Sequence, residues 1–140
     1  MNGQPYIDGI VARLREVFEV PVYTERAEQD FIVPCFAVES GRTGQTPIPN
    51  GQYFRETEYI VTYYPVSGVR RRQECLEVME TLFCLLETVP LGENARARGL
   101  GLRGEVLDDV LHFFVKFRAV VRKKEVFEKM DNLEVKGALK

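Results

Sequence analysis

The pattern of hydrophobic and polar positions predicts an amphipathic helix over residues 5–19. Apolar side chains recur there at i, i+3, i+4, i+7 and i+11, and the polar residues between them fall on the other face. These apolar positions are Ile7, Ile10, Val11, Leu14 and Phe18. Pro21 disfavours helical geometry at the residue before it, so we expect the helix to end there.

A second helix is predicted to follow Ser67 and Gly68 and to run to about residue 88. Pro90 and Gly92 come directly after it and terminate it. The stripe that we expect to face the core consists of Leu76, Met79, Leu82, Phe83 and Leu86. The arginines and glutamates of this segment are expected to face mostly toward solvent.

The first half of the chain also predicts three strands and one long loop. Residues 22–24 and 35–38 read as short strands, and residues 53–64 form a long run of aromatic, β-branched and charged residues. Twelve extended residues span roughly 40 Å, about twice a typical strand, so part of this run is expected to project as an arm of a hairpin. Residues 41–52 are rich in Gly, Pro, Thr and Asn and predict a loop, which is long enough to suggest a functional role.

Two further strands are predicted near the end of the chain. Residues 98–107 are interrupted by glycines and should therefore be bent or bulged, and Asp108 and Asp109 predict a turn. The next segment alternates strictly and leaves one wholly apolar face, which indicates a strand laid on a helix layer. The residues of that face are Leu111, Phe113, Val115, Phe117, Ala119 and Val121.

These elements predict an α+β fold in the order α-β-β-β-α-β-β, with two helices packed on one face of a mainly antiparallel sheet. Residues 1–124 are expected to form a single domain. Residues 125–140 form a C-terminal extension, read either as a frayed tail or as an arm that adds a strand to a sheet edge of this subunit or a neighbour.

Composition narrows the class of protein. The chain has 140 residues, 45% of them hydrophobic, and a formal net charge of -2, which excludes a disordered chain, a coiled-coil rod and a generally basic nucleic-acid binder. No apolar run reaches the length of a membrane-spanning helix, and the first residues do not read as a secretory signal. The three cysteines are interpreted as buried free thiols in a reducing cytoplasm.

The residue inventory argues against an enzyme and supplies no predicted cofactor or metal site. His112 is the only histidine and lies on the polar side of its strand, so we read it as a surface or interface residue. The stretch GLGLRG matches the letters of a dinucleotide-binding motif, but no helix follows it to face a phosphate. Glu56 and Glu58 share a strand face and are read as solvated.

Basic residues and tyrosines suggest protein contacts. The arginine clusters at residues 70–72, 96–103 and 122–124 are diluted by nearby acidic residues, so we expect salt bridges between subunits and no specific nucleic-acid binding. Tyrosines crowd residues 53–64, where they serve either the core or an interface.

Five segments carry a resemblance to a known family: IDGIVARLREVF, VYTERAEQDFIVPCFAV, YFRETEYIVTYYP, GEVLDDVLHFFVKFRAVVRKK and MDNLEVKG. Together they resemble the tail-terminator-like proteins encoded in tail gene clusters of bacteriophages and of prophage elements in Gram-positive bacteria. The similarity covers nearly the whole chain and rests on apolar and aromatic patterns.

The resemblance implies a structural protein of the virion tail, assembled in the host cytoplasm. Its implied partners are copies of itself in a hexameric ring, the tail tube protein that the ring caps, and the head-tail connector. We expect the interface to use segments that have no obvious task in a monomer. The candidate interface residues are Arg42, Gln45, Ile48, Tyr53, Arg55, Tyr63, Arg70, Arg98, Leu133 and Val135. The alternatives are another tail or neck component, such as a head-completion or tube-like protein, and a stand-alone ligand-binding domain.

Overall fold

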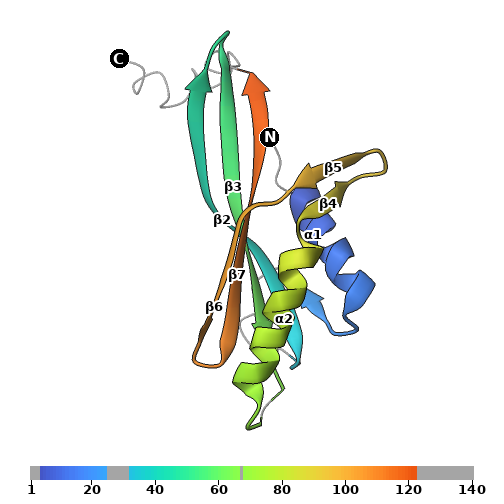
Figure 1. Cartoon of the computed structure of the whole chain (residues 1–140). Coiled ribbons are helices and arrows are strands. Elements are labelled where there is room, and N and C mark those ends of the chain that lie inside the picture. Colours follow the sequence, from blue (N-terminus) through green and yellow to red (C-terminus); the bar gives the residue numbers. More distant parts are fainter. Residues whose placement is uncertain (1–3, 25–31, 67, 123–140) are drawn as a thin grey trace, which may run out of the picture.

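Two helices cover one face of a five-stranded sheet in the computed structural model, which describes residues 4–24, 32–66 and 68–122 (Figure 1). In chain order the elements are α1 (Gln4–Val17), β1 (Val22–Tyr23), β2 (Cys35–Ile48), β3 (Gln52–Tyr64), α2 (Arg71–Leu85), β4 (Thr88–Leu91), β5 (Ala95–Arg98), β6 (Leu100–Leu107) and β7 (Val110–Arg122). The sheet order is β1-β2-β3-β7-β6, and only the β1–β2 pair is parallel. The predicted α+β class is confirmed.

The core lies between the helices and the central strands β3 and β7. Val61 of β3 stands opposite Phe113 of β7, and both side chains are fully buried. Along β7 the alternation predicted from the sequence holds for Leu111, Phe113, Val115 and Phe117. Ala119 and Val121 are only half-buried, which corrects the expectation of a fully covered face, because β7 runs on beyond the helix layer there.

The first helix buries Ile10, Val11 and Leu14 as predicted but ends at Val17, before the predicted residue 19. The second helix ends at Leu85, before the predicted residue 88, and it buries a different side from the one predicted. In α2 the buried residues include Cys75, Val78 and Leu85, whereas Leu76 is 40% exposed. Leu82 and Leu86 are fully buried as expected. Apolar residues occur on several sides of α2, so periodicity alone could not select the buried one.

The prediction of a loop over residues 41–52 is wrong. β2 continues through this region and pairs with β3 as far as Ile48 opposite Gln52, after a bulge between Ser40 and Thr43. The turn that follows uses Asn50 and Gly51, both at positive φ, a conformation that these residue types tolerate well. The ladder offered by β3 outweighs the low strand propensity of glycine and proline in β2.

A small additional sheet was not predicted. β4 and β5 form a two-stranded antiparallel sheet directly after α2, and α1 packs against β4. The glycine-interrupted strand is bent as expected, because Gly99 separates β5 from β6 and the register of β6 shifts between Leu100 and Arg103.

Three strands extend past the helices as a projecting arm, seen at the top of Figure 1. We define the arm as residues 41–56 of the β2–β3 hairpin with residues 118–122 of β7, which pair through Gly44, Glu56 and Arg118. The prediction that part of residues 53–64 projects is therefore confirmed. The arm also contains the end of β7, a strand that the sequence predicted but did not place in the projection.

Candidate assembly surfaces

Both long edges of the arm are open in the part of the chain that the structure describes. β1 pairs only with Phe36 and Ala37, so the outer edge of β2 has no neighbour farther along the arm. On the other side, pairing between β6 and β7 ends at Leu100 opposite Lys116, so β3 is the strand partner of residues 118–122 among residues 4–24, 32–66 and 68–122. Open edges present backbone N–H and C=O groups that can pair with another chain.

The two edges differ in character. The β2 edge carries the bulge at Ser40 and Thr43 and includes Pro47, which lacks a backbone N–H. Bulges and prolines are devices that protect an edge strand from uncontrolled pairing. The β7 edge has no bulge in its pairing with β3 and contains Ala119, Val120 and Val121, so the two sides of the arm are different surfaces.

One face of the arm continues the core face of the sheet. Arg55 donates from Nε and Nη2 to Gln45 Oε1, at 2.8 and 2.6 Å, and the hydroxyls of Thr43 and Thr57 lie 3.1 Å apart. Where this face meets α1, an open hollow of about 260 Å³ lies over three packed aromatic rings. The rings are those of Tyr6, Tyr59 and Phe117. This face is held by side-chain pairs and is not covered by a helix.

The opposite face of the arm combines arginines, glutamates and aromatic rings. Arg118 Nη2 lies 2.6 Å from Glu56 Oε2, and its guanidinium stacks 4.7 Å from the centre of the Phe54 ring. Closer to the body, Arg103 pairs with Glu58 at 3.4 Å. The two glutamates are therefore ion-paired, which corrects the expectation that they are merely solvated.

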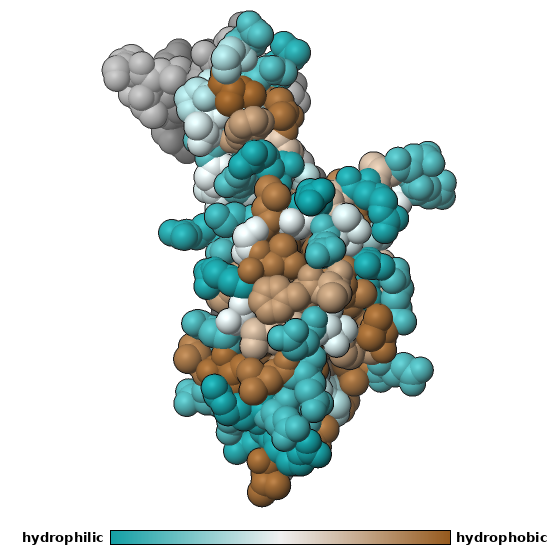
Figure 2. All heavy atoms as spheres, viewed as in Figure 1, coloured by the Kyte–Doolittle hydropathy of each residue, from teal (hydrophilic) through white to brown (hydrophobic). Residues whose placement is uncertain are grey.

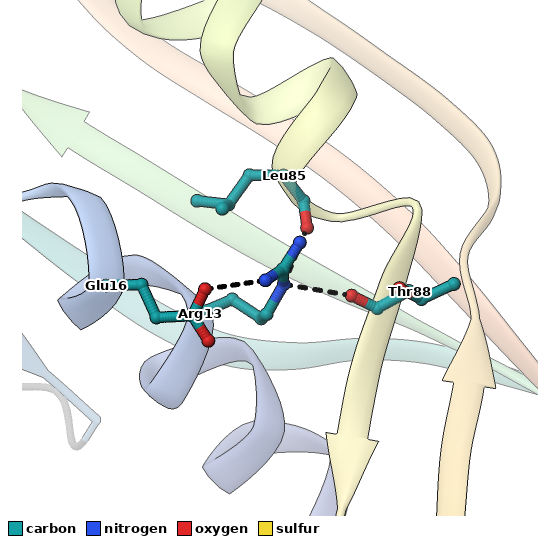
Figure 3. Close-up of polar contacts among 4 residues, drawn as sticks. All are labelled: Arg13, Glu16, Leu85 and Thr88. Atoms are coloured by element: carbon teal, nitrogen blue, oxygen red, sulfur yellow. Dashed lines mark hydrogen bonds and ion pairs between the residues drawn. The ribbon is translucent and has the colours of Figure 1, made fainter.

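A second surface is the groove between α1 and α2, an open hollow of about 590 Å³. Its lining consists of Arg13, Val17, Glu80, Thr81, Cys84 and Leu85. Arg13 Nε donates to the carbonyl oxygens of Leu85 and Thr88 at 3.0 and 3.1 Å, and Nη1 lies 2.6 Å from Glu16 Oε1 (Figure 3). One arginine thus joins α1, the end of α2 and β4, and it fixes the shape of the groove.

A third candidate surface lies at the end of the molecule opposite the arm. Figure 2 shows a hydrophobic group at this lower tip, with mainly hydrophilic side chains around it. The exposed apolar residues near the strand ends here are Ile32, Val33, Val66, Val69 and Leu107. Val69 is fully exposed.

The arrangement offers surfaces for protein contacts. Among the described residues, no group of three or more His, Cys, Asp or Glu side chains is placed to hold a metal ion. Within the same residues, no helix has the length and apolar character needed to cross a membrane.

A protein-family model described as phage tail terminator protein matches residues 7–129. The chain belongs to this family. The resemblance found in the sequence is thereby confirmed, and it identifies a structural protein of a phage tail. No curated protein matches the chain.

The terminator's predicted interface residues divide into four groups. Arg42, Gln45, Ile48, Tyr53 and Arg55 all lie on the arm. The structure therefore brings together five residues that the sequence divided between a loop and a strand. Their use by a partner stays a prediction.

The other predicted residues are scattered or excluded. Arg70 and Arg98 are exposed, one before α2 and the other at the end of β5. The prediction of Tyr63 as an interface residue is wrong, because Tyr63 is only 5% exposed and packs in the core against Phe36. Leu133 and Val135, with the whole extension 125–140, lie outside the described residues.

Sequence reasoning missed two residues on these surfaces of the terminator. Val120 is 54% exposed on the arm. An apolar residue on the polar side of an alternating strand was the signal that could have identified it. Cys84 is exposed in the groove, which corrects the expectation that all three cysteines are buried. Cys35 and Cys75 are buried, and desolvation raises the pKa of both thiols.

Proposed function

We propose that the protein forms a closed ring of six copies that caps the phage tail tube and joins it to the head-tail connector. The observation that carries the proposal is the arm, which extends past the helix layer with an exposed Val120 and with two different edges that no other described strand covers. A closed ring needs two different complementary surfaces on each subunit. The arm and the body of the chain provide surfaces of different kinds.

The exposed apolar residues at the end opposite the arm favour contacts with a second kind of partner. If the arm serves contacts around the ring, the exposed Val69 and Leu107 remain for contacts along the tail axis, to the tube protein or the connector. We extend the proposal to residues 125–140 as an added strand or arm between subunits, with Leu133 and Val135 as its contact residues. Family membership favours a terminator over other tail or neck components.

Native mass spectrometry of the purified protein, with and without tail tubes, tests the ring. We expect a species of six copies, which the variant Val120→Asp should disrupt because it places a charge at a contact. Leu107→Asp is the matched control for ring formation in the absence of tubes, because Leu107 is 53% exposed against 54% for Val120 and lies at the opposite end. A protein that stays monomeric even on tubes contradicts the proposal.

Tail length in assembled particles tests the capping role. A terminator that stops tube growth should give tails of uniform length, and loss of the ring should give overlong tubes in electron micrographs. A chain truncated after residue 124 tests the extension in the same way, and tails of normal length would exclude a role for residues 125–140.

A further inference from the structure

We propose that the arm of one copy docks in the groove between α1 and α2 of the next copy. This inference rests on the proposed ring and names the two surfaces that meet in it. The occupant of the groove is a second copy of this chain, and the contact is head-to-tail, since arm and groove are different surfaces of one subunit.

Charge favours this pairing. The arm carries four arginines and one glutamate, and that glutamate, Glu56, is already paired with Arg118. Beyond Arg71 and Arg72 in its first turn, α2 carries three glutamates and no lysine or arginine. One of these, Glu80, lines the groove. Opposite charges attract the arm to Glu80 in the groove, whereas two arms, both rich in arginine, repel each other, so the charge pattern favours the heterologous contact.

Arg13, the positively charged residue of the groove, does not cancel this attraction. The Arg13 guanidinium is engaged by the carbonyl oxygens of Leu85 and Thr88 and by the carboxylate of Glu16. These three acceptors lie within the same subunit (Figure 3). The charge of Arg13 is therefore compensated locally, and Glu80 remains to meet an incoming arginine.

Exposed apolar side chains on both the arm and the groove also favour docking. In the groove, Val17 is 52% exposed and lies beside Cys84 and the buried Leu85. On the arm, Val120 is similarly exposed and Phe54 and Ile48 are half-buried. Docking removes these side chains from water together, which is the main favourable term in protein association.

Thiol crosslinking tests the docking in the full chain, because Cys84 is in the groove and is the one exposed cysteine of the three. The variant Val120→Cys adds a thiol on the arm, and a short bis-maleimide should then join copies into covalent chains of up to six. Leu107→Cys, with its thiol at the opposite end, should give no such series. Cys84→Ser combined with Val120→Cys should abolish it.

A charge exchange tests the same contact without chemistry on cysteine. Glu80→Arg should raise the dissociation constant of the ring by about tenfold or more, because it places like charges together. Arg122→Glu in the same chain should restore assembly, and Arg98→Glu, away from the arm, should not. The effect of Glu80→Arg should shrink at high salt.

The outcomes separate the docking from the ring. A six-copy ring that gives no Cys84-dependent crosslinks and is indifferent to Glu80→Arg overturns the docking and leaves the proposed function intact. Crosslinks of Val120→Cys that persist after Cys84→Ser show arm-to-arm contact and also overturn it. Crosslinks from Cys84 to the tube protein alone assign the groove to another occupant. Absence of any ring overturns both proposals.

Discussion

Arg13 on α1 donates a hydrogen bond from Nε to the carbonyl oxygen of Leu85, the last residue of α2, at 3.0 Å. The last carbonyls of a helix have no partner within the helix and must be satisfied from elsewhere. Arginine does this here from a neighbouring helix, and its positive charge also complements the negative end of the α2 dipole. The contact stabilises α2 and positions it against α1.

Replacing Arg13 should therefore cost more stability than a surface arginine normally contributes. Arg13→Met leaves the carbonyl oxygens of Leu85 and Thr88 without this donor, and we expect a loss of about 1–3 kcal/mol in the free energy of unfolding by urea. Arg15→Met on the exposed side of α1 is the control and should change stability by less than about 0.5 kcal/mol. Equal losses for the two variants would contradict the assigned role.

The buried tyrosine Tyr63 should make stability depend on pH in the alkaline range. Desolvation by burial, and then its hydrogen bond to Glu74, raise the pKa of the Tyr63 hydroxyl far above its ordinary value. An unfolded chain loses this proton near pH 10, whereas the folded chain keeps it. The stabilisation is thus complete below about pH 10 and declines as pH rises above it, because the unfolded state then binds fewer protons.

Tyr63→Phe tests this linkage. Urea unfolding followed from pH 8 to 11 should show a shallower decline for the variant. At neutral pH the variant should lose about 1.5–3 kcal/mol in the free energy of unfolding, the usual range for a hydrogen bond to a charged group. Tyr6 and Tyr59 are also buried with raised pKa values, so part of the decline should remain. A slope identical to that of the unmodified protein would remove Tyr63 from this explanation.

Gly9 should not tolerate a methyl group. A Cβ atom built there would lie 2.3 Å from the carbonyl oxygen of Pro90 in β4, so α1 and β4 would have to separate. We expect Gly9→Ala to lower stability by about 1–3 kcal/mol, the range for overpacked sites. Gly44→Ala on the arm is the control, because its Cβ would meet nothing within 4 Å, and its thermal midpoint should stay close to that of the parent.

The three cysteines should differ in reactivity. A colorimetric thiol reagent at pH 8 should titrate three thiols in denaturant, but Cys35 and Cys75 should react slowly in the native protein, because they are buried with raised pKa values. In Cys84→Ser, native protein should show no rapid reaction. A rapidly reacting thiol in that variant would contradict the burial of the other two.

Local patterns predicted the elements that have one unambiguous buried face. Strict alternation in β7 identified Leu111 to Phe117 as core residues, and helical spacing identified Ile10 and Leu14. In α2, Cys75 and Val78 compete with Leu76 for the buried side, and only the sheet beneath decides between them. Periodicity fails where more than one face is apolar.

Long-range pairing explains what the sequence did not predict. Residues 41–48 have loop composition, yet β3 imposes strand geometry on them across the whole hairpin. The arm residues were found because Tyr53 and Arg55 lie in a strand too long for a small domain. The groove was missed because it exists only where Arg13 meets Leu85 and Thr88, which are 72 and 75 residues away along the chain.

Because β3 and β7 run without interruption from the core into the arm, the core limits which changes of sequence the arm can accept. Val61 and Phe113 are buried opposite each other in the same two strands that place Phe54 opposite Val120 in the arm. A slip of one residue would turn Val61 out of the core, so the core fixes the alignment of the distant tip. An insertion of one residue in β3 between these pairs would exchange the side chains that β3 presents on the two faces of the arm, while those of β7 would keep their places. The bulge between Ser40 and Thr43 makes such a change in β2, where one extra residue shifts which side chains face each side of the arm beyond it.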